Sequence, residues 1–205
     1  MIVKVVDYES GNLRSVSRAL ETAGAQPVLT SDPDALKSAN AIVLPGVGSG
    51  RAAMEALEQR GLVKPLQEAV ASGTPVLCIC LGLQLLMDDT EEGSSPCLGI
   101  ISGTTRKLPD SLKVPHMGWN SVSFRHEHPL LDGIPDGSYF YFVHSYYAEP
   151  LKNDVATGVT EYGLPFCSVL TQGNVMATQF HPEKSGDFGL KIYSNFVDYA
   201  SVVWK

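Results

Sequence analysis

The chain of 205 residues is 44% hydrophobic and 18% charged, and its formal net charge is −7. A chain of this length and composition can bury enough apolar surface to fold without disulfide bonds, so we predict one domain over residues 1–205. The negative charge argues against a surface for nucleic acid or anionic membranes. The first residues reach an acidic side chain too soon for a signal peptide, and no apolar run approaches the roughly 18 residues of a membrane span. We therefore expect a cytoplasmic protein.

The first half of the chain alternates short apolar runs with helical patterns. Apolar runs without alternation favour strands that are buried on both faces. The order of strands and helices is typical of an α/β fold with a flavodoxin-like open, mainly parallel sheet and helices on both faces. Strands are predicted over residues 2–8, 25–30, 40–46 and 74–80, and helices over 12–24, 51–61, 62–73 and 82–87.

The second half has a different pattern. Short strands separated by Gly, Asn, Asp and Pro favour added antiparallel strands. These strands are predicted over residues 120–124, 138–148, 155–159, 166–170 and 174–180, and a closing helix over 189–203.

The four cysteines do not have the spacing of a disulfide framework, and two lie in one apolar run, which favours a reducing compartment. Zinc sites use C-x-x-C pairs or clustered histidines, whereas this chain has a C-x-C pair and scattered histidines. We therefore predict no metal and no cofactor. The cysteines are Cys78, Cys80, Cys97 and Cys167.

The run "PVLCICLGLQLL" over residues 75–86 places a thiol where a buried strand turns into a helix. Ligands bind at the carboxyl ends of parallel strands, and the partial positive charge of a helix N-terminus stabilises a thiolate. A sharp turn of this kind needs small residues two positions before and after the nucleophile. Around Cys80 these are Cys78 and Gly82, so the pattern selects Cys80 over Cys78. The alternative is that Cys80 only fills the core as a small hydrophobic residue.

The run "QFHPEKS" contains a base and an orienting group for such a nucleophile. Pro182 biases His181 toward extended backbone, in which residues two apart point the same way. The carboxylate of Glu183 could then hold one nitrogen of His181 while the other faces Cys80. This spacing predicts a Cys–His–Glu triad, and a structural role for the histidine is the alternative.

The run "LPGVGSG" over residues 44–50 follows a strand and precedes a helix. Its backbone N–H groups could face an oxyanion, or the glycines could only form a turn. Glycine tolerates φ of either sign, so we expect the Gly46–Val47 peptide to be the pivot if the oxyanion hole forms by rotation of a peptide. The run lacks both nucleotide-binding glycine spacings.

With these elements in order, the chain resembles the class I, triad-type glutamine amidotransferases, which carry G-x-C-x-G and H-x-E. Cys80, Gly82, His181 and Glu183 match those motifs, and Cys78 replaces the first glycine. Three stretches make the chain most similar to the glutaminase subunits of imidazole glycerol phosphate synthase. They are "DYESGNLRSV" at 7–16, "PHMGWN" at 115–120 and "FVHSYY" at 142–147.

The resemblance implies a function and a partner. Such a subunit hydrolyses glutamine to glutamate through a thioester on the nucleophilic cysteine. Its ammonia passes through a tunnel into a cyclase subunit, which makes imidazole glycerol phosphate in histidine biosynthesis. The expected assembly is a heterodimer. The alternatives are a glutaminase of another ammonia-channelling synthase, such as pyridoxal phosphate synthase, a thiol hydrolase, or a non-catalytic binding module on the same fold.

The resemblance also implies roles for individual residues. The oxyanion hole would use the N–H of Leu81 and that of Val47 or Gly48. The amino-acid end of glutamine would be held, largely through backbone groups, by Gln84, Ser145 and Tyr146. Four residues would lie near the partner interface, namely Asn12, His116, Trp119 and Asn120.

Overall fold

The structure is a computed structural model that describes residues 1–9 and 11–203. Ser10, in the 7–16 stretch, and residues 204–205 lie outside that description. An eight-stranded sheet forms the centre of the structure. The strand order is β2-β1-β3-β4-β14-β13-β12-β9, and the first five strands are parallel. The parallel strands are β1 (Ile2–Val6), β2 (Gln26–Thr30), β3 (Ile42–Gly46), β4 (Val76–Cys80) and β14 (Val175–Thr178).

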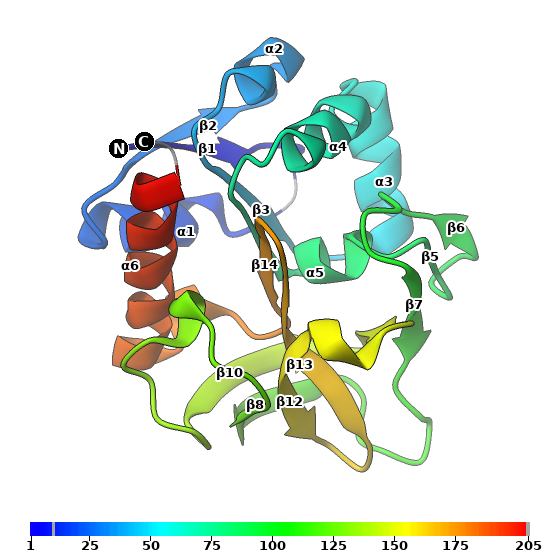
Figure 1. Cartoon of the computed structure of the whole chain (residues 1–205). Coiled ribbons are helices and arrows are strands. Elements are labelled where there is room, and N and C mark those ends of the chain that lie inside the picture. The colour runs from blue at the N-terminus through cyan, green and yellow to red at the C-terminus, as the bar shows by residue number, and fades with distance from the viewer. Residues whose placement is uncertain (10, 204–205) are drawn as a thin grey trace.

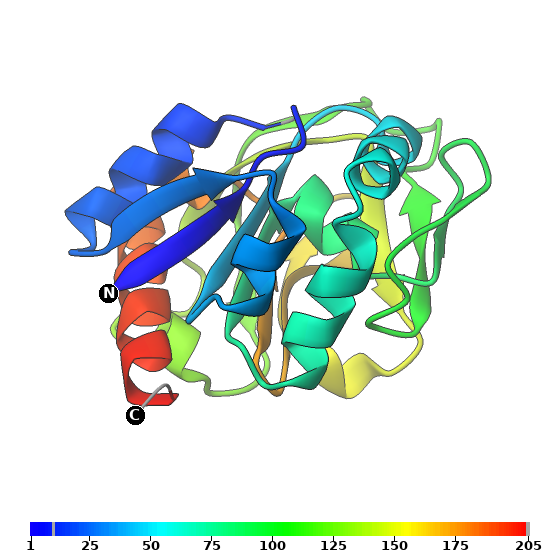
Figure 2. The same cartoon turned by 90° about the horizontal axis from the view of Figure 1, so that it is seen from above.

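Helices cover both faces of this sheet (Figure 1). α1 (Leu13–Thr22) and α6 (Gly186–Val203) pack on one face, while α3 (Gly50–Gln59), α4 (Val63–Ala71) and α5 (Leu81–Leu85) pack on the other, as the view from above in Figure 2 also shows. Every residue of β3 and β4 is buried, as expected for apolar strands between two helical layers. The predicted α/β architecture is therefore confirmed. A short helix that the pattern did not predict, α2 (Pro33–Lys37), packs beside α4.

The antiparallel strands extend the sheet at one edge. β13 (Pro165–Gln172) pairs antiparallel with β14, followed by β12 (Ala156–Glu161) and β9 (Ser123–Phe124). The prediction that residues 174–180 form only an antiparallel addition was wrong, because β14 also pairs in parallel with β4. β14 is buried along its whole length, and only a continuous apolar strand suits this central position.

One predicted strand, residues 138–148, is two strands in two different sheets. β10 (Tyr139–His144) pairs with β8 (His116–Ser121), whereas β11 (Tyr146–Pro150) pairs with β7 (Gly103–Lys107). Two further short strands, β5 (Asp89–Thr90) and β6 (Ser95–Pro96), complete the second of these sheets. The chain changes sheets at Ser145, so the turn between β10 and β11 places Ser145 and Tyr146 at the mouth of the site described below.

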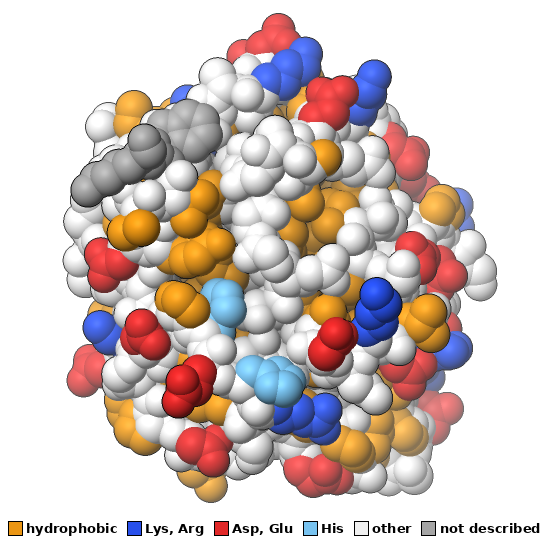
Figure 3. All heavy atoms as spheres, viewed as in Figure 1, with side chains coloured by type: hydrophobic (Ala, Val, Ile, Leu, Met, Phe, Trp, Pro, Cys, Tyr) orange, Lys and Arg blue, Asp and Glu red, His pale blue; other side chains and the backbone are white. Residues whose placement is uncertain are grey.

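Charged side chains of both signs are interspersed over the face shown in Figure 3, and no basic stripe forms among the described residues of that face. Within residues 1–9 and 11–203, no helix combines the length and the apolar character needed to cross a membrane. No group of three or more His, Cys, Asp or Glu side chains in the described part of the chain could hold a metal ion.

Candidate active site

The turn from β4 into α5 places the Cys80 thiol at the edge of a cavity. Cys80 occupies the N-cap position of α5 with φ 54° and ψ −105°, a conformation that costs a non-glycine residue energy and is common at functional sites. A Cβ on Gly82 would strike the carbonyl oxygen of Leu44, which explains why a glycine follows the elbow. The predicted spacing therefore has a direct steric cause on its C-terminal side.

Cys78 fits the place of the first elbow glycine without distorting the strand. Its side chain is completely buried, and it pairs in register with Leu44 and Ala177 of the neighbouring strands. Burial raises the pKa of the Cys78 thiol far above its ordinary value, which keeps it protonated and unreactive. Cys80, by contrast, lines the cavity. The structure thus separates the two thiols of the C-x-C pair.

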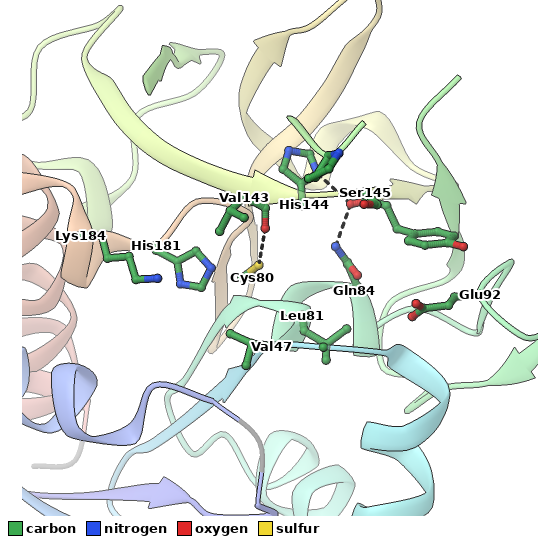
Figure 4. Close-up of a pocket in the computed structure, with 13 residues that line it drawn as sticks. Val47, Cys80, Leu81, Gln84, Glu92, Val143, His144, Ser145, His181 and Lys184 are labelled. Carbon is green, nitrogen blue, oxygen red and sulfur yellow. Dashed lines mark hydrogen bonds between the residues drawn. The ribbon is translucent and has the colours of Figure 1, made fainter. Parts of the chain in front are cut away.

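His181 lies beside Cys80, with its ring directed toward the thiol (Figure 4). Its Nδ1 is 2.8 Å from Oε1 of Glu183, and Tyr193 donates a hydrogen bond of 3.4 Å to Oε2 of the same carboxylate. Nε2 of His181 is buried and has no hydrogen-bond partner among the described residues. One ring nitrogen is therefore held in place, while the other is available to the sulfur.

The electrostatics of His181 favour its charged form. Burial lowers the pKa of the imidazole, but the neighbouring Cys80 and Glu183 together outweigh burial and raise the pKa to about 10. Tyr193, which is fully buried behind Glu183, has its pKa raised by burial and by the nearby carboxylate, so it stays a hydrogen-bond donor. The arrangement suits an imidazolium that forms when the thiol loses its proton.

The backbone around His181 differs in one respect from the prediction. His181 is extended, with φ −96° and ψ 98°, as the following proline requires. Glu183, however, lies in a short 3₁₀ turn (Pro182–Lys184) rather than on an extended strand. The turn still brings the carboxylate to Nδ1, so the contact was predicted correctly but the local geometry was not.

The opposite wall of the cavity contains the 44–50 turn. Val47, Gly48 and Leu81 all line the cavity, and Gly46 is paired in register with Cys80. Gly48 has φ +93°, and a Cβ built on it would have no neighbouring atom within 4 Å. Gly46 is crowded, because a Cβ there would lie 2.5 Å from Oη of Tyr8 and 2.8 Å from Cβ of Leu81.

The cavity continues from Cys80 toward Gln84 and Glu92 and has a volume of about 470 Å³. Figure 4 shows His181, Cys80, Gln84 and Glu92 in sequence across it, with Ser145 above Gln84. Gln84 is buried rather than solvated, and its Nε2 donates to the carbonyl oxygen of Tyr146 at 2.8 Å. The structure therefore brings the predicted substrate-binding residues into one cavity.

Several residues of the site were not predicted. Glu92, His144 and Lys184 line the cavity. Gln179 donates from Nε2 to the sulfur of Cys80 at 3.7 Å, and Tyr193 supports Glu183. The sequence did contain a signal for Gln179. It lies two residues before His181, so its side-chain amide is on the same short segment as the candidate base.

The four residues predicted near a partner do not share one environment. Trp119 is 55% exposed, whereas His116 is buried beneath Phe142 and Tyr162 and so offers no imidazole to a partner. Asn120 is partly buried and donates to the carbonyl oxygen of Glu161 at 3.0 Å. Asn12 occupies the N-cap position of α1, but its side chain makes no capping hydrogen bond.

The fold agrees with comparisons to known proteins. The sequence profile described as "Glutamine amidotransferase class-I" matches residues 4–199, so the chain belongs to the class I glutamine amidotransferase family. A crystal structure of a glutamine amidotransferase has a TM-score of 0.78, at 19% identity over 98% of this chain and all of the other. The structure of PurLQS from Thermotoga maritima has a TM-score of 0.76 at 19% identity, over 97% of this chain and 98% of that one. At this identity the two structures establish the fold alone.

Relatives with higher identity define the branch of the family. The imidazole glycerol phosphate synthase subunit HisH of Dehalococcoides mccartyi strain CBDB1 is 48% identical over 200 residues, covering 97% of this chain and 98% of the relative. The HisH subunit of Moorella thermoacetica is 47% identical, covering 95% of this chain and 93% of the relative. The chain therefore lies in the HisH branch of the class I amidotransferases.

Proposed function

We propose that this chain hydrolyses L-glutamine to L-glutamate and ammonia at Cys80, as the glutaminase subunit of an imidazole glycerol phosphate synthase. One observation carries the chemistry. The imidazole of His181 is held by Glu183 at 2.8 Å, and its other nitrogen is buried beside the thiol without a hydrogen-bond partner in the described structure. The HisH relatives, at 47–48% identity over nearly the whole chain, support the assignment of the synthase.

The first half-reaction transfers the acyl group of glutamine to the enzyme. The thiol proton of Cys80 passes to Nε2 of His181, and the thiolate forms a bond to the side-chain carbonyl carbon of glutamine. The carbonyl oxygen becomes an oxyanion, which the N–H groups of Leu81 and of Val47 or Gly48 stabilise. The C–N bond then breaks, and the leaving nitrogen takes the proton from His181 and departs as ammonia. A thioester remains on Cys80.

The second half-reaction restores the enzyme. Water enters the position left by ammonia, gives one proton to Nε2 of His181 and forms a bond to the thioester carbonyl carbon. The C–S bond breaks, the sulfur recovers the proton, and glutamate leaves. Glu183 orients the imidazole and stabilises the imidazolium in both steps. The net reaction consumes one glutamine and one water.

The far end of the cavity fits the amino-acid part of glutamine. Among the described residues that line the cavity, Glu92 has the one carboxylate, which suits the α-ammonium group. Glu92 also accepts a hydrogen bond from the backbone N–H of Gly50, which holds it at this end. The backbone N–H groups of Ser145 and Tyr146, next to Gln84, would bind the α-carboxylate, since their carbonyl oxygens already accept hydrogen bonds. The reacting amide would then lie at Cys80.

The partner is proposed to be a cyclase subunit that binds over the mouth of the cavity. Near neutral pH, ammonia released to water becomes ammonium, which is no longer a nucleophile, so direct transfer keeps it reactive. Exposed Trp119 packs edge-to-face on Tyr141 at 6.2 Å, and Nζ of Lys184, a cavity-lining residue, is 5.9 Å from the centre of the Tyr141 ring. Trp119 and Tyr141 thus form an aromatic surface that adjoins Lys184 in the wall of the cavity. An exposed aromatic surface at this place suits a docking partner.

A glutaminase assay with and without the cyclase subunit tests the proposal. Cys80→Ala should abolish glutamate production, whereas Cys97→Ala, a control outside the cavity, should leave it unchanged. A glutamine-like electrophile followed by peptide mass mapping should label Cys80. Labelling of Cys78 with Cys80 unmodified would contradict the assignment of the nucleophile. Stimulation of the glutaminase by the partner subunit of a different ammonia-channelling synthase, and not by the cyclase, would contradict the assignment of the synthase.

A further inference from the structure

We propose that Gln179 is an additional group of the catalytic centre, which donates a hydrogen bond to the Cys80 sulfur and stabilises its thiolate. Its Nε2 lies 3.7 Å from Sγ, within the range of a hydrogen bond to sulfur. Gln179 is completely buried, so water does not compete for its amide. The inference rests on the proposed function only in taking Cys80 as the nucleophile.

The orientation of the Gln179 amide follows from its neighbours. Nε2 of Gln84 donates to the carbonyl oxygen of Tyr146 at 2.8 Å, and a backbone carbonyl can only accept. The same Nε2 is 3.2 Å from Oε1 of Gln179, so its second hydrogen points there. Gln179 must therefore present its oxygen to Gln84 and its NH₂ group to the sulfur of Cys80.

A line of further hydrogen bonds holds the Tyr146 carbonyl from the other side. Nδ1 of His144 is 2.8 Å from this oxygen, so Nδ1 carries a proton and donates it. Nε2 of His144 is then an acceptor, and Nδ1 of His116 donates to it at 2.9 Å. Asn120 in turn lies with Nδ2 3.4 Å from Nε2 of His116. Its amide is itself oriented, because its oxygen accepts the N–H of Ser121 at 2.8 Å.

Both histidines of this line are neutral because they are buried. Only a neutral imidazole can donate through one ring nitrogen and accept through the other, as this line of hydrogen bonds requires. Burial lowers the pKa of His116 to about 4. For His144, burial is the largest cause and the neighbouring His116 and His181 add to it, while the hydrogen bond to Tyr146 opposes it, so that the pKa falls to about 3. Each imidazole thus donates through Nδ1 and accepts through Nε2 across the physiological range. A single direction of donation therefore runs from Asn120 to the carbonyl of Tyr146.

The two states of the Cys80 sulfur have different partners. As a thiol, its S–H can donate to the carbonyl oxygen of Val143, 3.9 Å away. When the proton moves to Nε2 of His181, the thiolate can only accept, and the Gln179 amide is already directed at it. Stabilisation of the thiolate without any side-chain movement is an electrostatic preorganisation of the nucleophile.

Gln179→Met tests the donor in the full chain, because methionine has a similar length and no N–H group. The rate at which iodoacetamide alkylates Cys80, mapped by peptide mass, should fall roughly tenfold at pH 7, at the low end of what a hydrogen bond to a charged group contributes. The pH profile of alkylation should move to higher pH. Glutaminase kcat with the cyclase should fall by a similar factor with little change in KM. The matched control is Gln67→Met, which removes a 2.7 Å hydrogen bond to the Leu98 carbonyl outside the cavity.

A second measurement needs no substitution. In the ¹⁵N-labelled wild-type chain, His116 and His144 should each carry the proton on Nδ1, and neither should titrate between pH 5 and 9. The Gln179 side-chain N–H signals should shift as Cys80 ionises. A folded Gln179→Met chain with the alkylation rate and pH profile of wild type would refute the donor. Gln179 side-chain N–H signals that stay fixed as Cys80 ionises would also refute the donor. Neither result depends on glutamine, so both are distinct from failure of the proposed reaction.

Discussion

Replacing Glu183 by Gln removes a buried charge from beside His181 and leaves the shape of the side chain almost unchanged. The carboxylate oxygen is 2.8 Å from Nδ1, and the side chain is 1% exposed. Two unit charges about 4 Å apart interact by about 4 kcal/mol at an effective dielectric constant of about 20. The glutamine oxygen can still accept the Nδ1 hydrogen and recovers about 1 kcal/mol of this. We therefore expect kcat/KM to fall roughly 10²–10³-fold, less than for His181→Ala.

The pH dependence supplies a second readout of the same substitution. Because Glu183 helps to raise the pKa of His181 to about 10, its loss should lower that pKa. The imidazolium is present below its pKa, so the alkaline limb of the rate profile should move to lower pH. Steady-state glutamate production with the cyclase, from pH 6 to 10, measures both effects.

The control for this substitution is Glu149→Gln, which removes a surface carboxylate paired with Arg106 at 2.9 Å. It should change kcat/KM little, since exposed ion pairs contribute about 0–1 kcal/mol. A Glu183→Gln chain with kcat/KM within threefold of wild type and an unmoved alkaline limb would show that another group orients His181.

Four further substitutions test other parts of the site. Cys78→Gly should keep or raise glutaminase activity while lowering the melting temperature, because it empties a fully buried position; loss of activity would make Cys78 part of the site. Gly46→Ala should lower both partner-stimulated activity and stability, because the new Cβ meets Tyr8 and Leu81; an unchanged thermal melt would contradict this. Gly48→Ala has space but an unfavourable φ of +93°, so kcat should fall at a stability cost of about 1–2 kcal/mol; unchanged kcat would remove this turn from the oxyanion hole. Trp119→Ala should weaken cyclase binding in calorimetry and leave the melt unchanged, whereas wild-type affinity would place the interface elsewhere.

Local patterns in the sequence were sufficient for the parallel strands of the first half of the chain and for the choice of the candidate reacting groups. Continuous apolar runs predicted β3 and β4, because strands between two helical layers have no polar face. The elbow spacing selected Cys80, since a Cβ two residues later would collide with the backbone of β3. The H-x-E spacing predicted the contact of His181 with Glu183, because residues so near in the chain can reach each other through local backbone geometry alone.

Contacts between distant segments were decided only by the tertiary structure. The chain changes sheets at Ser145, β14 lies beside β4, and Tyr193 reaches Glu183 from the last helix. Gln179 and Gln84 are 95 residues apart in the chain and meet only because β14 and α5 pack side by side. The sequence by itself determined which side chains could react, because that depends on residue type and near-neighbour spacing. Which amides, carbonyls and imidazoles surround them depends on the packing of segments that are far apart in the chain, and neighbouring residues in the sequence do not indicate that packing.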